Sequence, residues 1–199
     1  DGNKYTDMSL MGVGTNILGY NQIDVDQAVI NTVIKGNMTT LNCPEEVELA
    51  EKLIELHGDW AEMVKFARTG GEANAIAIRI ARAFSGKDQV AICGYHGWHD
   101  WYIAANLNDN ESLDNHLLSG LEAKGVPKSL KGSVFTFNYN NYEMLENIVK
   151  QNDIGIIKME VSRNTDPIPG YLKSIRKLAD ENNIILIFDE CTSGFRETY

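Results

Sequence analysis

The spacing of apolar residues changes repeatedly along this chain, which predicts an alternation of helices and strands. Apolar residues that recur every three or four positions predict helices, and short unbroken apolar runs predict buried strands. Runs such as IGIIKM and IILIF lack the in-and-out alternation of a half-exposed strand and are typical of parallel strands covered on both faces. The pattern therefore predicts an α/β fold, mainly a parallel sheet with helices on both faces.

Capping residues set the bounds of the expected helices. Asp24 is expected to cap a helix that ends at Lys35 before Gly36, and the Pro-Glu-Glu opening of segment 44–56 suits a first helical turn. The helix expected over 71–84 is rich in Ala and Ile and apolar on most sides, so we place it deep in the core. The remaining elements are strands at 63–67, 89–93, 133–137, 154–159 and 184–188, helices at 142–150 and 172–182, and a long excursion at 106–131 with one short helix.

Charge and cysteine content narrow the class of protein. Eighteen Lys and Arg residues against 28 Asp and Glu residues give a net charge of −10, which disfavours nucleic acid and anionic membrane surfaces as partners. The apolar stretches are too short for a membrane span, and the N-terminus carries no signal pattern. Three cysteines without CxxC spacing, Cys43, Cys93 and Cys191, favour neither a disulfide framework nor a metal site. We expect a cytoplasmic protein that binds a small molecule.

Open parallel sheets bind ligands at the carboxyl ends of their strands, so the residues after each predicted strand are the candidates. The turn RTGGEAN at 68–74 carries Gly70 and Gly71 before the long helix. Free N–H groups and the helix dipole favour a phosphate there, with Gly70 the tighter of the two positions. A plain strand-to-helix turn that needs glycine for its backbone angles has the same composition.

The loop GYHGWHDW at 94–101 is unusually dense in aromatic rings and histidines. An aromatic ring here can stack on a planar ligand, and a histidine can position or transfer a proton. The alternative is a set of loop aromatics that closes over the core.

Charged residues end two of the most apolar strands. Lys158 and Glu160 share one face because strand side chains alternate, and we interpret Lys158 as part of a structural ion pair and Glu160 as a site residue. Asp189 ends the strand at 184–188, where an ionised carboxylate is costly without a partner. A cationic ligand nitrogen would be such a partner.

Together these segments resemble the class-III aminotransferases of the pyridoxal-phosphate fold type I, and among them the glutamate-1-semialdehyde 2,1-aminomutases. The likeness runs from DGNKYTDM through PEEVELAEKLIEL, TGGEANAIAIRIARAFSGKDQV and YHGWHD to FDECTSGFR. The resemblance implies bound pyridoxal 5'-phosphate, amino-group transfer on a small amino or carbonyl compound, and a homodimer. It also implies that residues 1–40 belong to the small domain and interface, and residues 41–199 to the first part of the cofactor-binding major domain.

The resemblance assigns roles to individual residues. Asp189 would pair with the protonated ring nitrogen, which makes it the catalytic residue of this chain. The family's Schiff-base lysine lies beyond the FDECTSGFR segment and has no match here, so we expect a longer enzyme. The cofactor-binding residues implied are Gly70 and Gly71 at the phosphate, Tyr95 on the ring with His96 beside it, Cys191 on the opposite ring face, and Glu160.

The sequence departs from the family pattern at two positions, and, separately, two alternatives to an aminomutase stay open. Gly71 stands where the aminomutases usually have a hydroxyl residue, and Val161 stands where the family usually has proline. One alternative is an intermolecular ω-transaminase that acts on an amino sugar or amino acid. The other is a noncatalytic α/β domain that binds a different phosphate ligand at the Gly70–Gly71 turn.

Overall fold

The computed structural model describes residues 1–9, 11–36, 40–116, 119–162 and 164–196. Contacts divide the chain into two compact units, Asp1–Val64 and Lys65–Tyr199. The boundary between these two units lies after residue 64. The boundary that the sequence predicts after residue 40 concerns the domains of a complete enzyme, and it stays a prediction. All of the candidate site residues belong to the second unit.

The first unit contains the helices α1 (Ile23–Lys35) and α2 (Pro44–Leu56), both as predicted. Gln22, and not Asp24, caps α1, because its side-chain oxygen accepts hydrogen bonds from two backbone N–H groups of the first turn at 2.9 and 3.1 Å. Gly36 ends the helix with a φ of 102°. Neither helix has a buried residue.

The predicted strand at 63–67 is wrong. The described residues 61–67 have an irregular backbone, and the side chain of Met63 is 89% exposed. A strand needs a neighbour for its N–H and C=O groups, and in the described part of the chain no strand pairs with this segment.

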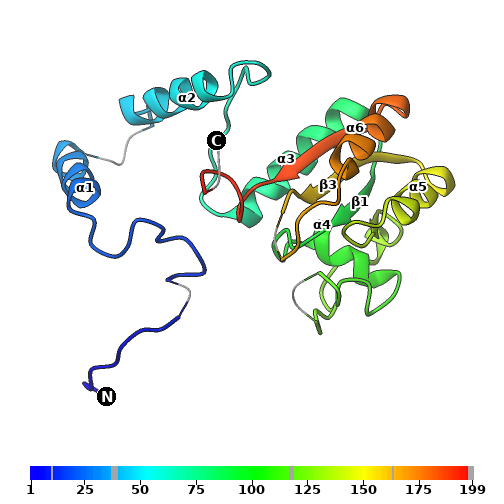
Figure 1. Ribbon diagram of the computed structural model, residues 1–199, viewed down its shortest axis with the longest axis horizontal. Coiled ribbons are helices and arrows are strands. Elements are labelled where there is room, and N and C mark those ends of the chain that lie inside the picture. The colour runs from blue at the N-terminus through cyan, green and yellow to red at the C-terminus, as the bar shows by residue number, and fades with distance from the viewer. Residues whose placement is uncertain (10, 37–39, 117–118, 163, 197–199) are drawn as a thin grey trace. The chain divides into compact units, whose positions relative to one another are not determined.

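The second unit is built on a four-stranded sheet in the order β2-β1-β3-β4 (Figure 1). Its strands are β1 (Gln89–Cys93), β2 (Val134–Thr136), β3 (Ile154–Glu160) and β4 (Ile185–Asp189). Every neighbouring pair is parallel, as the unbroken apolar runs predicted. The four observed strands match the predicted bounds to within one or two residues.

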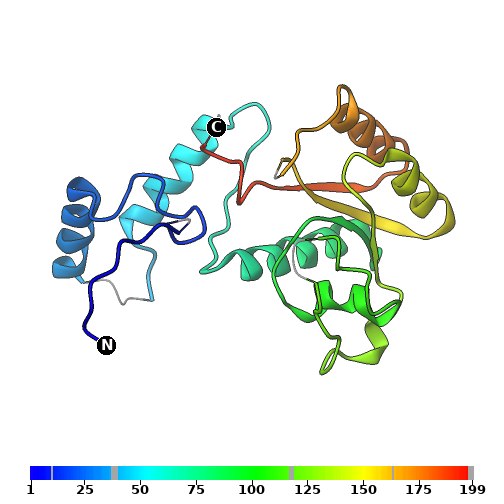
Figure 2. The ribbon, with the colours of Figure 1, turned by 60° about the horizontal axis from the view of Figure 1, so that its bottom comes forward.

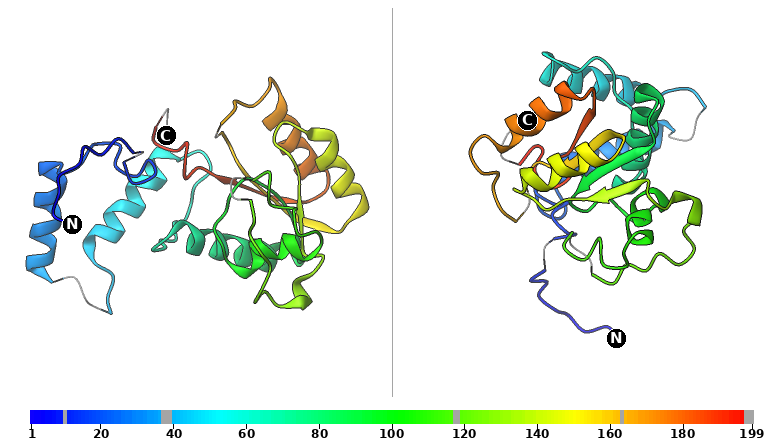
Figure 3. Two further views of the ribbon diagram at one scale, coloured as in Figure 1. Left: turned by 90° about the horizontal axis from the view of Figure 1, so that it is seen from below. Right: turned by 90° about the vertical axis from the view of Figure 1, so that its right-hand side faces the viewer.

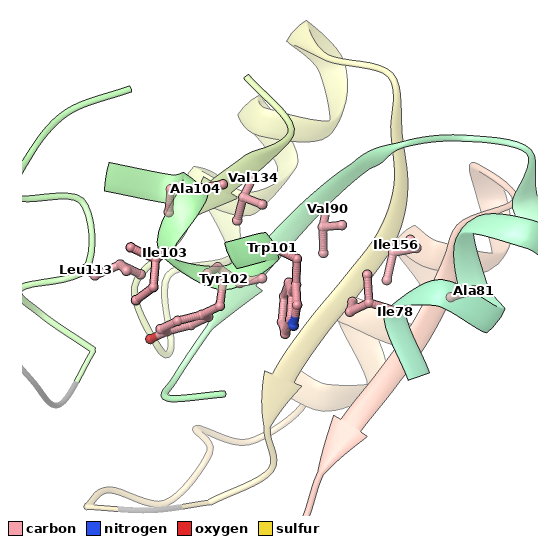
Figure 4. Close-up of a cluster of buried hydrophobic side chains, with 12 residues drawn as sticks. Ile78, Ala81, Val90, Trp101, Tyr102, Ile103, Ala104, Leu113, Val134 and Ile156 are labelled. Atoms are coloured by element: carbon pink, nitrogen blue, oxygen red, sulfur yellow. The ribbon is translucent and has the colours of Figure 1, made fainter. Parts of the chain in front are cut away.

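Helices cover both faces of this sheet (Figures 2 and 3). On one face lie α3 (Gly70–Ser85), α4 (Asp100–Ile103) and the 3₁₀ turn η1 (Ala104–Leu107). On the other face lie α5 (Tyr142–Gln151) and α6 (Tyr171–Glu181), while η2 (Lys128–Leu130) ends the long excursion. The two apolar clusters take alternate residues of each strand, so that Val90 and Ile156 face α3 (Figure 4).

The long helix α3 is less buried than the sequence predicted. Only Ile78 and Ala81 are buried, whereas Ile80 and Phe84 are 58% and 82% exposed. A helix turns its side chains through all directions, so only one stripe of α3 meets the sheet. Among the described residues, no helix is long and apolar enough to cross a membrane.

Candidate functional site

The candidate site lies at the edge of the sheet where three parallel strands end. Cys93 ends β1, Glu160 ends β3 and Asp189 ends β4. The register pairs Cys93 with Met159 and Glu160 with Asp189, so the three strands end at nearly the same level. Open parallel sheets bind ligands at this edge.

Asp189 is the buried centre of this edge, with 8% of its surface exposed. Its Oδ2 lies 2.9 Å from Nδ1 of His96 and 3.5 Å from Nζ of Lys158. Its Oδ1 accepts a hydrogen bond of 3.1 Å from the backbone N–H of Cys191. Burial opposes ionisation, but the hydrogen bond from His96 and the ammonium group of Lys158 prevail and lower the pKa of Asp189 below its usual range. Asp189 is therefore an anion.

His96 is fully buried and faces an acceptor on each side of its ring. Nδ1 donates to Asp189, and Nε2 lies 3.1 Å from the carbonyl oxygen of Cys93. A neutral imidazole has one N–H and satisfies only one of these contacts, whereas the imidazolium donates to both. Burial lowers the pKa of His96, while Asp189 raises it and Lys158 lowers it. His96 thus holds the carboxylate in a fixed orientation.

Lys158 forms an ion pair, as the sequence predicted, and its carboxylate partner is Asp189 on the neighbouring strand. The side chain is only 1% exposed. Burial lowers the pKa of Lys158, and the charges of Asp189 and Glu160 oppose that shift. Reasoning from a single strand could not identify this partner, because the contact depends on how two strands are aligned.

Glu160 is held by the loop that follows β1. Its Oε2 accepts a hydrogen bond of 3.3 Å from the backbone N–H of Tyr95. Gly94, with a φ of 110°, leaves the space for it, since a Cβ there would lie 2.5 Å from the same oxygen. The ring of Tyr95 is partly buried and meets Tyr102 edge to face at 5.9 Å.

The predicted phosphate turn begins α3. Thr69 caps the helix with its hydroxyl group, which accepts a hydrogen bond of 3.1 Å from the N–H of Glu72. The carboxylate of Glu72 accepts in turn from the N–H of Arg68 at 2.7 Å. Within the described residues, the N–H groups of Gly70 and Gly71 form no hydrogen bond. These two donors are therefore available to an anion at the positive end of the helix dipole.

Gly71, and not Gly70, is the tighter position of this turn. A Cβ at Gly70 would meet nothing within 4 Å, whereas a Cβ at Gly71 would lie 3.0 Å from the ring of His99. Gly97, with a φ of 95°, packs on the same turn, since its Cβ would lie 2.9 Å from the Cα of Gly71. Two glycines from separate segments thus let the phosphate turn and the aromatic loop touch.

A cavity of about 130 Å³ opens beside this edge. Cys93, Glu160 and His116 help to line it. His116 accepts a hydrogen bond of 3.0 Å at Nδ1 from the N–H of Gly94, and burial lowers the pKa of His116 to about 4. Burial also raises the pKa of Cys93 to about 12, so this thiol stays protonated. His116 belongs to the long excursion, whose weak pattern gave no sign of this role.

Cys191 is exposed, and its backbone N–H donates to the carboxylate of Asp189. No group of three metal-binding side chains occurs among the described residues. The structure thus brings Tyr95, His96, Glu160 and Asp189 to one edge, and places the phosphate turn against the same aromatic loop. The family model of the class-III aminotransferases matches residues 1–198.

The chain belongs to the class-III aminotransferase family. The resemblance to this family and to its aminomutases is therefore confirmed. The chain is 37% identical over 206 residues to the 3-aminobutyryl-CoA aminotransferase of Cloacimonas acidaminovorans, which covers 98% of this chain and 45% of that protein. It is 35% identical over 203 residues to the glutamate-1-semialdehyde 2,1-aminomutase of Campylobacter hominis, covering 98% and 43%.

Among solved structures, a transaminase with bound pyridoxal phosphate matches at a TM-score of 0.78 and 26% identity, over 92% of this chain and 44% of that one. This neighbour confirms the predicted α/β transaminase fold for the class-III chain described here. The chain spans about half the length of the curated relatives it matches.

Proposed function

We propose that this protein is a pyridoxal-phosphate-dependent aminotransferase or 2,1-aminomutase, with its cofactor at the carboxyl edge of the sheet. The observation that carries the proposal is Asp189, a buried and ionised carboxylate at the end of β4. An anion in this position is stabilised further by a cationic ring nitrogen. In the alternative, a noncatalytic domain that binds a different phosphate ligand, this carboxylate would only pair with His96 and Lys158.

The described residues fit the cofactor at both of its charged ends. The two N–H groups of Gly70 and Gly71 suit a phosphate, and the space beside Gly70 is open. Asp189 suits the ring nitrogen, and the partly buried ring of Tyr95 follows on the loop that contacts the same turn. For Cys191, which is exposed and follows Asp189 closely in the chain, we propose a position on the opposite ring face.

When bound, pyridoxal phosphate supplies an electron sink for the negative charge that develops on the substrate carbon. Asp189 would keep a proton on the ring nitrogen, because a carboxylate in a buried site favours a cationic partner. His96 would fix the orientation of that carboxylate through its hydrogen bond of 2.9 Å. The turn at Gly70 and Gly71 would bind the phosphate, and Glu160 would line the site from β3.

The identity of the reaction can be tested in the full-length protein. The visible absorption of bound pyridoxal phosphate should change on addition of the correct amino donor, as the cofactor is converted to pyridoxamine phosphate. An aminomutase should convert glutamate 1-semialdehyde without a second substrate, whereas a transaminase should need a separate carbonyl acceptor. The relative that transfers the amino group of 3-aminobutyryl-CoA favours testing that compound beside amino acids and amino sugars. A spectrum unchanged by every donor would contradict the proposal.

We also propose a homodimer that acts in the cytoplasm, with residues 1–40 contributing to the small domain and interface. Apolar residues of α1 support an interface, since Val29 and Val33 are 57% and 54% exposed. The three free cysteines are in keeping with a reducing compartment. Light scattering of the full-length protein should give twice the chain mass, and a monomeric active enzyme would refute the dimer.

A further inference from the structure

A buried lysine shares the carboxylate that the proposed function assigns to the ring nitrogen. Lys158 is 1% exposed, and its Nζ lies 3.5 Å from Oδ2 of Asp189. Its neighbours in the strand register are Ile92 and Ile187, both in the apolar cluster beneath α3. The charge is therefore surrounded by hydrocarbon on β1 and β4, and the carboxylates are what stabilise it.

An ion pair in this position is not explained by stability alone. Withdrawing an ammonium and a carboxylate from water costs several kcal/mol for each group, and an apolar pair of similar volume is often as stable. Of the six residues of β3 other than Lys158, only Glu160 is ionisable, so the strand otherwise follows an apolar pattern. The lysine occurs where its charge acts on the candidate site.

We propose that Lys158 is a positioning residue that competes with the ring nitrogen for Asp189 and so lowers the affinity of the site for a protonated ring. The inference rests on the proposed function. Its basis is one shared atom, since Oδ2 of Asp189 already contacts both His96 and Lys158. A third donor would therefore compete with these two for the same carboxylate. The charged and titratable groups that face the ammonium are Asp189 on β4, Glu160 on β3 and His96 after β1.

The size of the effect follows from the contact distance. A ring nitrogen hydrogen-bonded to Asp189 would lie within roughly 8 Å of Nζ, given the 3.5 Å ion pair. At an effective dielectric constant of about 20, two positive charges at that separation repel each other by on the order of one pKa unit, or about tenfold in affinity. Removing the charge of Lys158 should therefore strengthen binding of a cationic ring.

The test measures ligand binding to the full-length protein, freed of cofactor, by calorimetry. The probe is 4-deoxypyridoxine 5'-phosphate, which keeps the ring nitrogen and phosphate but has no aldehyde. Benzyl phosphate is the comparison ligand because it lacks the nitrogen. Lys158→Met should bind the pyridine probe about tenfold more tightly than the wild type does. Its affinity for benzyl phosphate should be unchanged. Lys158→Arg, which keeps the charge, should match the wild type.

Lys87→Met is the matched control. It removes an ion pair of 2.8 Å between Lys87, before β1, and Asp153, before β3, at the end of the strands opposite the candidate site. This variant should bind both ligands with unchanged affinity. Lys158→Gln replaces the Met variant if circular dichroism shows that the latter is unfolded. Equal changes for both ligands, no change, or selective weakening of the pyridine probe would overturn the inference. If the wild-type protein bound neither ligand, the proposed function itself would be refuted.

Discussion

The contact between Gly71 and Gly97 should leave the site little tolerance of added volume. In Gly97→Ala the new Cβ would lie 2.9 Å from the Cα of Gly71, a backbone atom that has no side-chain freedom to move away. The φ of 95° adds strain, because it lies in a region that L-residues rarely adopt. Both costs act on the segment that joins the phosphate turn to the aromatic loop.

The two costs can be separated by a matched substitution. Positive φ alone costs about 1–2 kcal/mol, and overpacking against backbone adds about 1–3 kcal/mol, so Gly97→Ala should lose roughly 2–5 kcal/mol. Gly86→Ala at the end of α3 has a φ of 69° and no atom within 4 Å, so it should lose only the first of these terms.

Urea unfolding of the full-length protein, followed by circular dichroism, measures both variants. Gly97→Ala should also bind 4-deoxypyridoxine 5'-phosphate more weakly, because the turn and the loop are forced apart, while Gly86→Ala should bind it normally. If Gly97→Ala were no less stable than Gly86→Ala and bound the probe equally well, the close packing of the two segments would be refuted.

Two further predictions concern single side chains. Asp189→Ala should retain some cofactor through the phosphate turn yet lose turnover by orders of magnitude, and the turnover of Asp189→Glu should be intermediate at best. A coupled transaminase assay measures both variants. Near-normal turnover of the Ala variant would count against the ring-nitrogen role. His116 has its pKa lowered to about 4 in the folded state, so the unfolded chain binds more protons between about pH 4 and pH 6.5, and stability should fall as the pH drops through that window. His116→Gln should flatten the fall by about 2–3 kcal/mol in urea titrations at pH 4 and pH 7, and an identical pH dependence in both proteins would contradict the assignment.

The sheet could be predicted closely from the sequence because buried parallel strands are unbroken apolar runs. The strands ending at Cys93, Glu160 and Asp189 have this pattern, and their charged or polar ends mark the edge of the candidate site. The predicted strand at 63–67 is wrong because a local pattern does not reveal whether a partner strand exists. The cap of α1 is Gln22 and not the predicted Asp24, because the helix begins at Ile23, before Asp24.

The parts of the site that the sequence missed depend on packing between distant segments. Lys158 meets Asp189 only because β3 and β4 are aligned side by side. The tightness of Gly71 comes from Gly97 and His99, which are more than twenty residues away in the chain. His116 reaches the edge from an excursion without clear periodicity, and no local signal indicated its hydrogen bond to Gly94.

A crystal structure of the full-length protein with pyridoxal phosphate tests the central claim most directly. The account predicts the phosphate within hydrogen-bond distance of the N–H groups of Gly70 and Gly71, and the ring nitrogen within hydrogen-bond distance of the carboxylate of Asp189. A phosphate bound elsewhere, or a ring nitrogen turned away from Asp189, would contradict it.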